Sequence, residues 1–343
     1  MNDESNNKIE LLITFPLPEE LIKKIKDISP LLEVSHLPVK NRDEISEEVW
    51  SKTEILVTER VLPTSEMAPN LKWVQFNFAG IDFAIEEEIF EKEDLVITTL
   101  SGAAAPQVAE FAITMMLALS HKLPSLQKFQ INHEWPPDRF TRFTPKELRN
   151  STVGLIGYGS ISREIARLLV PFEVKILACK KNVMVTQDNG YIIDGLGDPA
   201  GNLFTRLYPY QAIKSMMKEC DFVVVTVPRT EDTFHLISEE ELSVLKSNAF
   251  IIDVSRGGII KNSALRAALQ DKKLAGAALD VFEQEPLPKD NPLWDTPNLI
   301  ISPHIAGVSI RYNERSVNLI VENLKKYINK TSLLNTFDPN SGY

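Results

Sequence analysis

Short apolar stretches alternate with helix-like stretches along almost the whole chain, and this alternation limits the fold more than any other feature. In the first hundred residues, strands are predicted at 10–15, 54–58, 71–77 and 95–100, with helical spacing over 18–28 and 42–50. A second series of strands is predicted at 152–157, 174–179, 222–227, 249–255, 276–282 and 298–302. Because strands separated by helices pair in parallel, the pattern predicts an α/β protein with two doubly wound parallel sheets.

Three further helix signals frame the second series. A long apolar helix is predicted to begin near Pro106, since proline suits the first turn of a helix. The sequence SEEE at 238–241 fits a capping box, and a last helix is predicted within 309–328. These signals indicate two α/β units, of which the second is the more regular.

Composition excludes several classes of protein. A chain of 343 residues is too long for one ordinary core, and its hydrophobic content of 43% and charged content of 24% are typical of soluble globular proteins. The formal charge of −10 argues against nucleic-acid binding. Cys179 and Cys220 have no CxxC spacing, so neither a disulfide framework nor a metal site is expected.

Targeting signals are not apparent. The N-terminal residues MNDESNNK are polar and lack the apolar core of a signal peptide. The apolar segment from Val108 contains a glutamate and is too short to cross a bilayer. We therefore expect a cytoplasmic protein that does not bind membranes.

The sequence VGLIGYGSIS at 153–162 predicts a strand, a glycine turn and a helix. Gly157 allows the tight turn, and Gly159 lets the backbone approach a pyrophosphate at the helix N-terminus. Ser162 replaces the third glycine of the dinucleotide-binding fingerprint, and it is small enough for the close packing of helix and strand that this position needs. The context predicts a Rossmann-like dinucleotide site rather than a structural turn.

The next strand, ILAC at 176–179, ends in Lys180 and Lys181. Lys180 stands 180 − 157 = 23 positions after Gly157, close to where an acidic residue ordinarily binds the ribose 2′-hydroxyl of NAD. A lysine there would attract the 2′-phosphate of NADP. The lysines favour NADP over NAD without excluding NAD, and a solvated strand end remains the simpler alternative.

Three reactive side chains follow the ends of late strands. Arg256 lies in VSRGGII, Glu285 in ALDVFEQEPLP, and His304 in PHIAG. The carboxyl ends of parallel strands face a common ligand crevice, so these groups are expected to converge. An arginine, a carboxylate and a histidine together suit redox chemistry on an oxo acid.

These motifs, together with GYGSI, NFAGID at 77–82 and AAPQVAEFA at 104–112, resemble the D-isomer-specific 2-hydroxyacid dehydrogenase family. The resemblance implies a discontinuous substrate domain at 1–104 and 308–343, with the dinucleotide-binding domain inserted at 105–307. It implies hydride transfer between a nicotinamide cofactor and C2 of a small D-2-hydroxy acid or 2-oxo acid. It also implies a homodimer built across the nucleotide domain.

The resemblance assigns roles that side-chain chemistry supports. Arg256 would bind the substrate carboxylate with its planar fork. His304 would be the acid/base at the C2 oxygen, and Glu285 would orient it and favour its charged form. The backbone of Ala79 and Gly80 would also meet the substrate carboxylate, and Asp280 would contact the nicotinamide carboxamide. The remaining histidines and both cysteines are expected to be structural or exposed.

The full set of residues expected to bind the cofactor lies at turns after the predicted strands. It comprises Gly157, Tyr158, Gly159, Ser160, Ile161, Lys180, Lys181, Val227, Pro228, Val254, Ser255, Asp280, His304 and Gly307.

Two departures and two alternatives stay open. The acidic residue of the cofactor strand is missing, and residues 182–208 form a longer connection than is usual in the family, predicted as a structureless surface hairpin or lid. The same three catalytic residue types occur in nucleotide-sensing co-repressors of this fold, although no long interaction tail is evident here. A formate dehydrogenase is less favoured, because the related enzymes carry glutamine where Glu285 stands. The substrate and the direction of the reaction are not set by the sequence.

Overall fold

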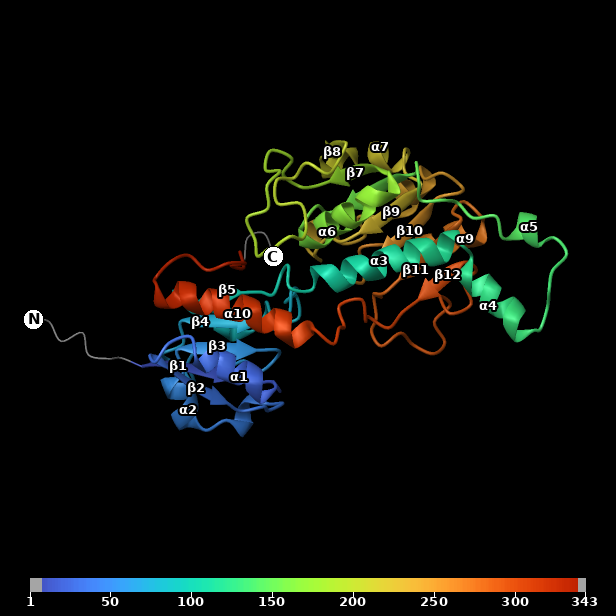
Figure 1. The fold of residues 1–343 in the computed structure, drawn as a ribbon. Coiled ribbons are helices and arrows are strands. Elements are labelled where there is room, and N and C mark those ends of the chain that lie inside the picture. The colour runs from blue at the N-terminus through green and yellow to red at the C-terminus, as the bar shows by residue number, and fades with distance from the viewer. Residues whose placement is uncertain (1–7, 339–343) are drawn as a thin grey trace, which may run out of the picture. The chain divides into compact units, whose positions relative to one another are not determined.

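The computed structural model of the chain describes residues 8–338 and divides into two compact units (Figure 1). Unit 1 combines the chain up to Ala104 with the chain from Ser309 onward, and unit 2 is Ala105–Val308. Each unit contains one parallel sheet, which confirms the predicted α/β class.

Unit 1 has a five-stranded sheet in the order β2-β1-β3-β4-β5. Its strands are β1 (Ile9–Ile13), β2 (Leu32–His36), β3 (Ile55–Thr58), β4 (Trp73–Phe76) and β5 (Val96–Thr98). Its helices are α1 (Glu19–Lys26), α2 (Glu47–Lys52) and α10 (Tyr312–Ile328), and short 3-10 turns lie at Arg42–Glu44 and Glu88–Glu91. Helix α10 packs beside α1 although almost three hundred residues separate them, so the C-terminal segment completes unit 1.

Unit 2 has a seven-stranded sheet in the order β12-β11-β10-β9-β6-β7-β8. Its strands are β6 (Thr152–Ile156), β7 (Lys175–Cys179), β8 (Arg206–Tyr208), β9 (Phe222–Val225), β10 (Phe250–Asp253), β11 (Gly276–Leu279) and β12 (Leu299–Ile301). The chain leaves β6 toward one edge of the sheet and returns on its other side at β9. Ligands of doubly wound sheets bind at this reversal.

The helices of unit 2 do not all pack on its sheet. They are α3 (Ala105–Ser120), α4 (Leu123–Ile131), α5 (Arg139–Arg142), α6 (Ser160–Leu169), α7 (Ile213–Met217), α8 (Glu239–Ser243) and α9 (Asn262–Gln270), with 3-10 turns at Val170–Phe172, Tyr210–Ala212 and Glu231–Thr233. Helix α3 packs beside α6 and over β10 and β11, whereas α7 packs on β6 and β7. The predicted capping box is confirmed, since the backbone N–H of Ser238 donates to Glu241 at 3.1 Å.

Two local expectations were wrong, and one strand of unit 1 was not expected. Residues 182–208 are not structureless throughout, because β8 extends the sheet beside β7. The single helix expected over 42–50 is a 3-10 turn followed by α2, since the Ser46 hydroxyl caps a new helix by accepting from the Val49 N–H. The edge strand β2 was not predicted, because its residues after Leu32 are only half-buried or exposed and give no apolar run.

Within residues 8–338, no helix combines the length and apolar character needed to cross a bilayer. Within the same residues, no group of histidine, cysteine and acidic side chains could hold a metal ion.

Candidate active site

The glycine turn after β6 has the geometry that a pyrophosphate requires. Gly157 has φ +90°, and a Cβ there would lie 3.2 Å from the backbone nitrogen of Val227, so glycine is needed for both conformation and space. Gly159 precedes the first turn of α6, and a Cβ added to it would meet nothing within 4 Å. The helix N-terminus is therefore open to an anion, as a dinucleotide site needs.

Ser162, at the third fingerprint position, is fully buried and bonded. Its hydroxyl lies 2.8 Å from the hydroxyl of Thr226, which also donates to the carbonyl of Gly157 at 3.2 Å. The serine is therefore satisfied by a partner on the loop after β9, and it ties the helix to the turn. Thr226 was not among the predicted site residues, although its place directly after β9 could have indicated it.

The predicted cofactor residues collect at one edge of the unit 2 sheet. Because β10, β9 and β6 are neighbours, the turns that follow them lie next to one another. Those turns carry Gly157, Tyr158, Gly159, Ser160, Ile161, Val227, Pro228, Val254 and Ser255. The residues present thus fit a dinucleotide, which would rest its pyrophosphate on the start of α6.

Both lysines after β7 have partners within the chain. The Lys180 ammonium donates to the carbonyl of Val185 at 2.8 Å, and Lys181 forms an exposed ion pair with Asp232 at 2.9 Å. Partial burial, and then the nearby charge of Arg163, lower the pKa of Lys180. An anion bound beside Lys180 would offset the repulsion between the positive charges of Lys180 and Arg163.

Arg256 follows β10 in a turn that lies tightly against the loop carrying Glu285. A Cβ at Gly257 would lie 1.7 Å from the carbonyl oxygen of Phe282, so only glycine allows this approach. Arg256 is half-buried and donates to the carbonyl of Ser255 at 2.8 Å. The close approach brings the arginine turn against the start of the glutamate loop.

Glu285 and His304 form a hydrogen-bonded pair. The Nδ1 atom of His304 lies 2.7 Å from Oε2 of Glu285, and Oε1 of the same carboxylate accepts from the Phe282 N–H at 2.9 Å. A carboxylate only accepts, so the proton between them belongs to Nδ1 of His304. This arrangement leaves Nε2 as the ring atom available for proton exchange with a ligand.

Asp280 holds the loop that carries His304. Its carboxylate accepts from the Ser302 hydroxyl at 2.7 Å and from the backbone N–H groups of Ile305 at 2.9 Å and Ala306 at 2.8 Å. Gly307, at the end of this loop, accepts a 2.8 Å bond from the Gln107 side chain. Asp280 and Gly307 therefore position the His304 loop, and contact with a cofactor stays a prediction for both.

A second buried carboxyl lies beside this loop. Asp253, at the end of β10, accepts from the backbone and the hydroxyl of Ser255 and is buried. Burial, assisted by the charge of Asp280, raises the pKa of Asp253 to about 7. Sequence inspection gave no signal for it, because a strand-end aspartate is usually solvated.

The remaining residues named from the sequence are two loop residues of unit 1 and the two cysteines of unit 2. Ala79 and Gly80 lie in the bend after β4 in unit 1, and their predicted role stays a prediction. Cys179 and Cys220 are buried, and burial raises the pKa of each thiol to about 12. Both thiols are therefore structural, as expected.

The comparisons with known proteins agree with this geometry. Residues 113–306 match the family model of the D-isomer specific 2-hydroxyacid dehydrogenase NAD-binding domain. The chain is 30% identical to the glyoxylate reductase of Thermofilum pendens over 92% of this chain and 90% of that protein.

Two solved structures share the whole fold. A D-isomer specific 2-hydroxyacid dehydrogenase family protein of Aeromonas salmonicida aligns with a TM-score of 0.77 and 28% identity, covering 97% of this chain and 99% of that one. A D-isomer specific 2-hydroxyacid dehydrogenase of Xanthobacter autotrophicus, in complex with NADPH and MES, aligns with a TM-score of 0.80 and 24% identity over 98% of this chain and 100% of that one. The chain belongs to the D-isomer-specific 2-hydroxyacid dehydrogenase family and is a nicotinamide-dependent oxidoreductase of that family.

Proposed function

We propose that the protein reduces a small 2-oxo acid to the D-2-hydroxy acid, or catalyses the reverse oxidation, with His304 as the acid/base. The observation that carries the proposal is the 2.7 Å contact between His304 Nδ1 and Glu285 Oε2, on a loop fixed by Asp280. An imidazolium held in this way can give its Nε2 proton to the developing C2 alkoxide. In the oxidative direction the neutral imidazole takes that proton back.

Arg256 is proposed to bind the substrate carboxylate. Its guanidinium is half-buried after β10, beside the loop of Glu285, and its planar fork matches two carboxylate oxygens. Its charge also polarises a carbonyl next to that carboxylate. Ala79 and Gly80 are proposed to bind substrate through backbone N–H donors.

The cofactor is proposed to be NADP, with NAD as the alternative. When bound, the nicotinamide supplies or receives the hydride at C2. Gly159 leaves the start of α6 open for its pyrophosphate, and Lys180, just after β7, is proposed to contact a 2′-phosphate. The substrate class is proposed to include glyoxylate, which the name of the Thermofilum pendens relative indicates. That relative's name also favours catalysis over a nucleotide-sensing role.

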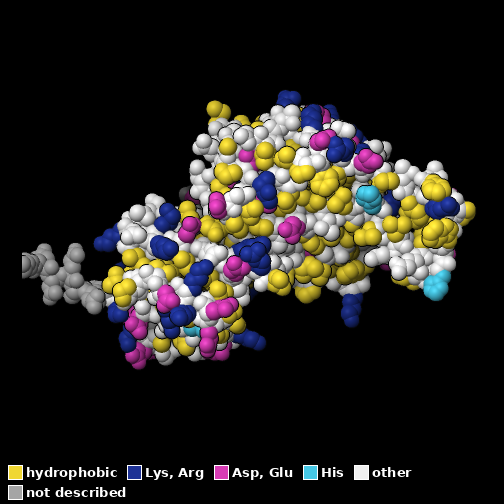
Figure 2. Space-filling model, in the orientation of Figure 1, with side chains coloured by type: hydrophobic (Ala, Val, Ile, Leu, Met, Phe, Trp, Pro, Cys, Tyr) yellow, Lys and Arg dark blue, Asp and Glu magenta, His cyan; other side chains and the backbone are white. Residues whose placement is uncertain are grey.

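A homodimer is proposed through the segment of α4 and α5, residues 123–142. Ile131, Trp135 and Phe140 of this segment are exposed by 76%, 83% and 77%. Figure 2 shows hydrophobic side chains gathered over this part of unit 2. Apolar surface of this kind usually marks an interaction site, and a second copy of the chain would cover it. Sedimentation velocity of the full chain would test this assembly.

The test of the proposed reaction is cofactor oxidation. NADPH and NADH would each be mixed with glyoxylate, hydroxypyruvate or pyruvate, and the fall in reduced cofactor recorded. His304→Ala should lower kcat by about 10²–10⁴ while leaving cofactor binding nearly unchanged, because only the proton donor is lost. Unchanged turnover in this variant with the best substrate would remove His304 as the acid.

A further inference from the structure

Helix α6 buries two charged side chains directly after the phosphate turn. Arg163 is 1% exposed and Glu164 is 2% exposed, and both follow Ser162 in the sequence. Charged groups are almost never buried to this degree unless they are paired. Their burial on the helix of the dinucleotide site requires a partner that covers them.

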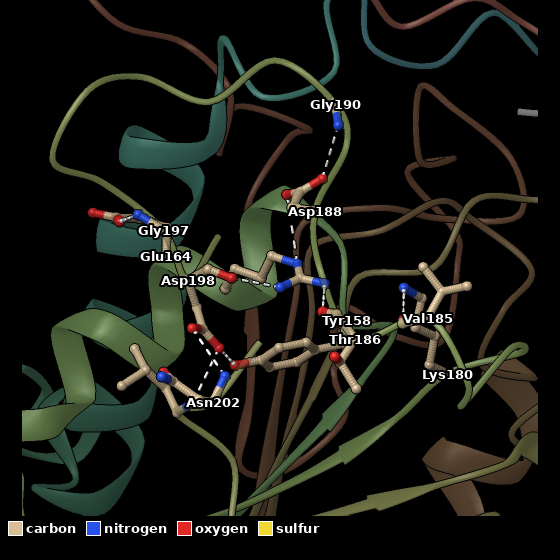
Figure 3. A network of polar contacts seen from close by, with 12 residues as sticks. Tyr158, Glu164, Lys180, Val185, Thr186, Asp188, Gly190, Gly197, Asp198 and Asn202 are labelled. Atoms are coloured by element: carbon tan, nitrogen blue, oxygen red, sulfur yellow. Dashed lines mark hydrogen bonds and ion pairs between the residues drawn. The ribbon is translucent and has the colours of Figure 1, made fainter. Parts of the chain in front are cut away.

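The partner is the long connection between β7 and β8, here called the inserted segment (residues 182–205). The Arg163 guanidinium donates to the backbone carbonyls of Thr186 and Asp198, and its Nε lies 3.5 Å from the carboxylate of Asp188 (Figure 3). The charge of Glu164 is paired with Arg167 of the same helix at 2.6 Å, and its carboxylate also accepts from the backbone N–H of Gly197 in the segment at 2.7 Å. Arg163 thus joins two parts of the segment that lie 198 − 186 = 12 residues apart.

The phosphate turn itself is tied to the inserted segment. The Tyr158 hydroxyl donates to the Asp198 carboxylate at 2.7 Å, and the Tyr158 ring contacts both the Arg163 guanidinium and the edge of Phe204. Burial, and then the bond to Asp198, raise the pKa of Tyr158, so its hydroxyl remains a donor. The turn and the segment are one hydrogen-bonded unit.

Asp198 is held in place from the segment's own backbone as well. It accepts from the N–H groups of Asn202 at 3.1 Å and Leu203 at 3.0 Å. Burial of Asp198 acts to raise its pKa, but the bonds from Tyr158 and these two N–H groups outweigh it and lower the pKa overall. The carboxylate therefore stays charged beside Arg163.

The near end of the inserted segment reaches Lys180. The carbonyl of Val185 accepts the Lys180 ammonium at 2.8 Å, and the next residue, Thr186, is the one whose carbonyl Arg163 holds. A lysine ammonium has further N–H donors, so this bond still allows contact with phosphate oxygens. Fixing a long side chain before a ligand arrives reduces the entropy cost of binding.

We propose that Arg163 is a positioning residue for the 2′-phosphate of NADP. By docking the inserted segment on α6, it fixes the Val185 carbonyl and, through it, the Lys180 ammonium. The inference rests on the proposed NADP-dependent function. Arg163 is not a catalytic residue, because its guanidinium is buried and bonded within the protein.

The alternative is that Arg163 only stabilises the fold. In that case its loss weakens every cofactor equally, because the whole turn is disturbed. A positioning role instead affects ligands that carry the 2′-phosphate and leaves the others nearly unchanged. The ratio of the two affinities separates these roles.

The experiment uses Arg163→Lys, which keeps the charge but cannot bridge two carbonyls in the same way. Calorimetric titrations at fixed ionic strength would measure NADPH, NADH, 2′,5′-ADP and 5′-AMP. Losing one pre-positioned lysine should weaken NADPH and 2′,5′-ADP by about two- to twelvefold, with NADH and 5′-AMP changed by less than about twofold. Limited proteolysis within residues 189–196 should become faster, which reports undocking of the segment.

Two further variants support the comparison. Asp188→Asn removes the charge opposite Arg163 but keeps the oxygen that accepts the Gly190 N–H, and it should shift selectivity in the same direction if Arg163→Lys does not fold. Arg149→Lys alters a surface pair with Glu173 and serves as the matched control, with all four affinities unchanged.

The outcomes are distinguishable. Equal weakening of NADPH and NADH, or unchanged selectivity with faster proteolysis, overturns the positioning role of Arg163 alone. A wild-type protein that binds NADH but neither NADPH nor 2′,5′-ADP overturns the proposed NADP site and the inference with it. A wild-type protein that binds no nicotinamide cofactor contradicts the proposed function itself.

Discussion

Nδ1 of His304 and Oε2 of Glu285 lie 2.7 Å apart, and the second oxygen of Glu285 is held by the Phe282 N–H at 2.9 Å. The backbone N–H of Phe282 thus holds one oxygen of the carboxylate while the other oxygen contacts the imidazole. Because the carboxylate accepts at both oxygens, the pair sets the tautomer of His304, with a proton on Nδ1.

Glu285→Gln should lower kcat for 2-oxo acid reduction. Glu285 accepts at both of its oxygens, from His304 Nδ1 and from the Phe282 N–H, whereas glutamine has only one oxygen and cannot keep both bonds. The measurement is kcat with the best substrate at saturating cofactor. A kcat equal to that of the wild type would contradict the pairing of these two residues in catalysis.

Arg256→Lys should raise KM for the 2-oxo acid and lower kcat. A lysine is a point charge and cannot reproduce a two-point grip on a carboxylate, so kcat/KM should fall by about 10- to 150-fold. Steady-state kinetics at saturating cofactor would measure this. Kinetics like those of the wild type would remove Arg256 from the substrate site.

Lys180→Asp should weaken NADP binding and shift preference toward NAD. Loss of a charged hydrogen bond predicts a drop in NADP affinity of about 10- to 150-fold, and the new carboxylate repels the 2′-phosphate. Lys181→Ala is the matched control and should matter less, because Lys181 pairs with Asp232 on the surface. Equal and unchanged affinities for both cofactors would identify the lysines as a solvated strand end.

Asp253→Asn should flatten the pH dependence of stability. Burial raises the pKa of Asp253 to about 7, so its folded form favours the proton. The stability from this group is therefore fully present below the carboxyl's ordinary pKa of 3.8 and is lost as pH rises through about 7.

The check is urea unfolding at several pH values across that window. As the pH rises toward neutral, the free energy of unfolding of the wild type should decrease because of Asp253. The Asp253→Asn variant should show no such decrease. Asparagine can still accept from Ser255, so the local contacts are kept. Parallel curves for the two proteins would show that Asp253 does not titrate there.

The pairing of Glu285 with His304 was implied by the family resemblance. The alternation of strands and helices, the glycine turn and the convergence of the residues after the late strands could be predicted from the residues themselves. These features are local or follow from topology. Once β11 and β12 are recognised as neighbouring parallel strands, their carboxyl ends must meet, and the residues beyond them are brought together. The separation of 19 positions along the chain therefore did not obscure their contact.

The surroundings of Arg163 could not be predicted from the sequence. In the sequence, an arginine and a glutamate in SREIARLL read as the solvent face of a helix. Their burial depends on the inserted segment, whose glycine-rich sequence has no period to indicate where it docks. Periodicity reports which face of an element is apolar, but it carries no information about an irregular segment that later covers the polar face. The polar contacts of Arg163, Tyr158 and Asp198 arise from that covering, so they exist only in the folded chain.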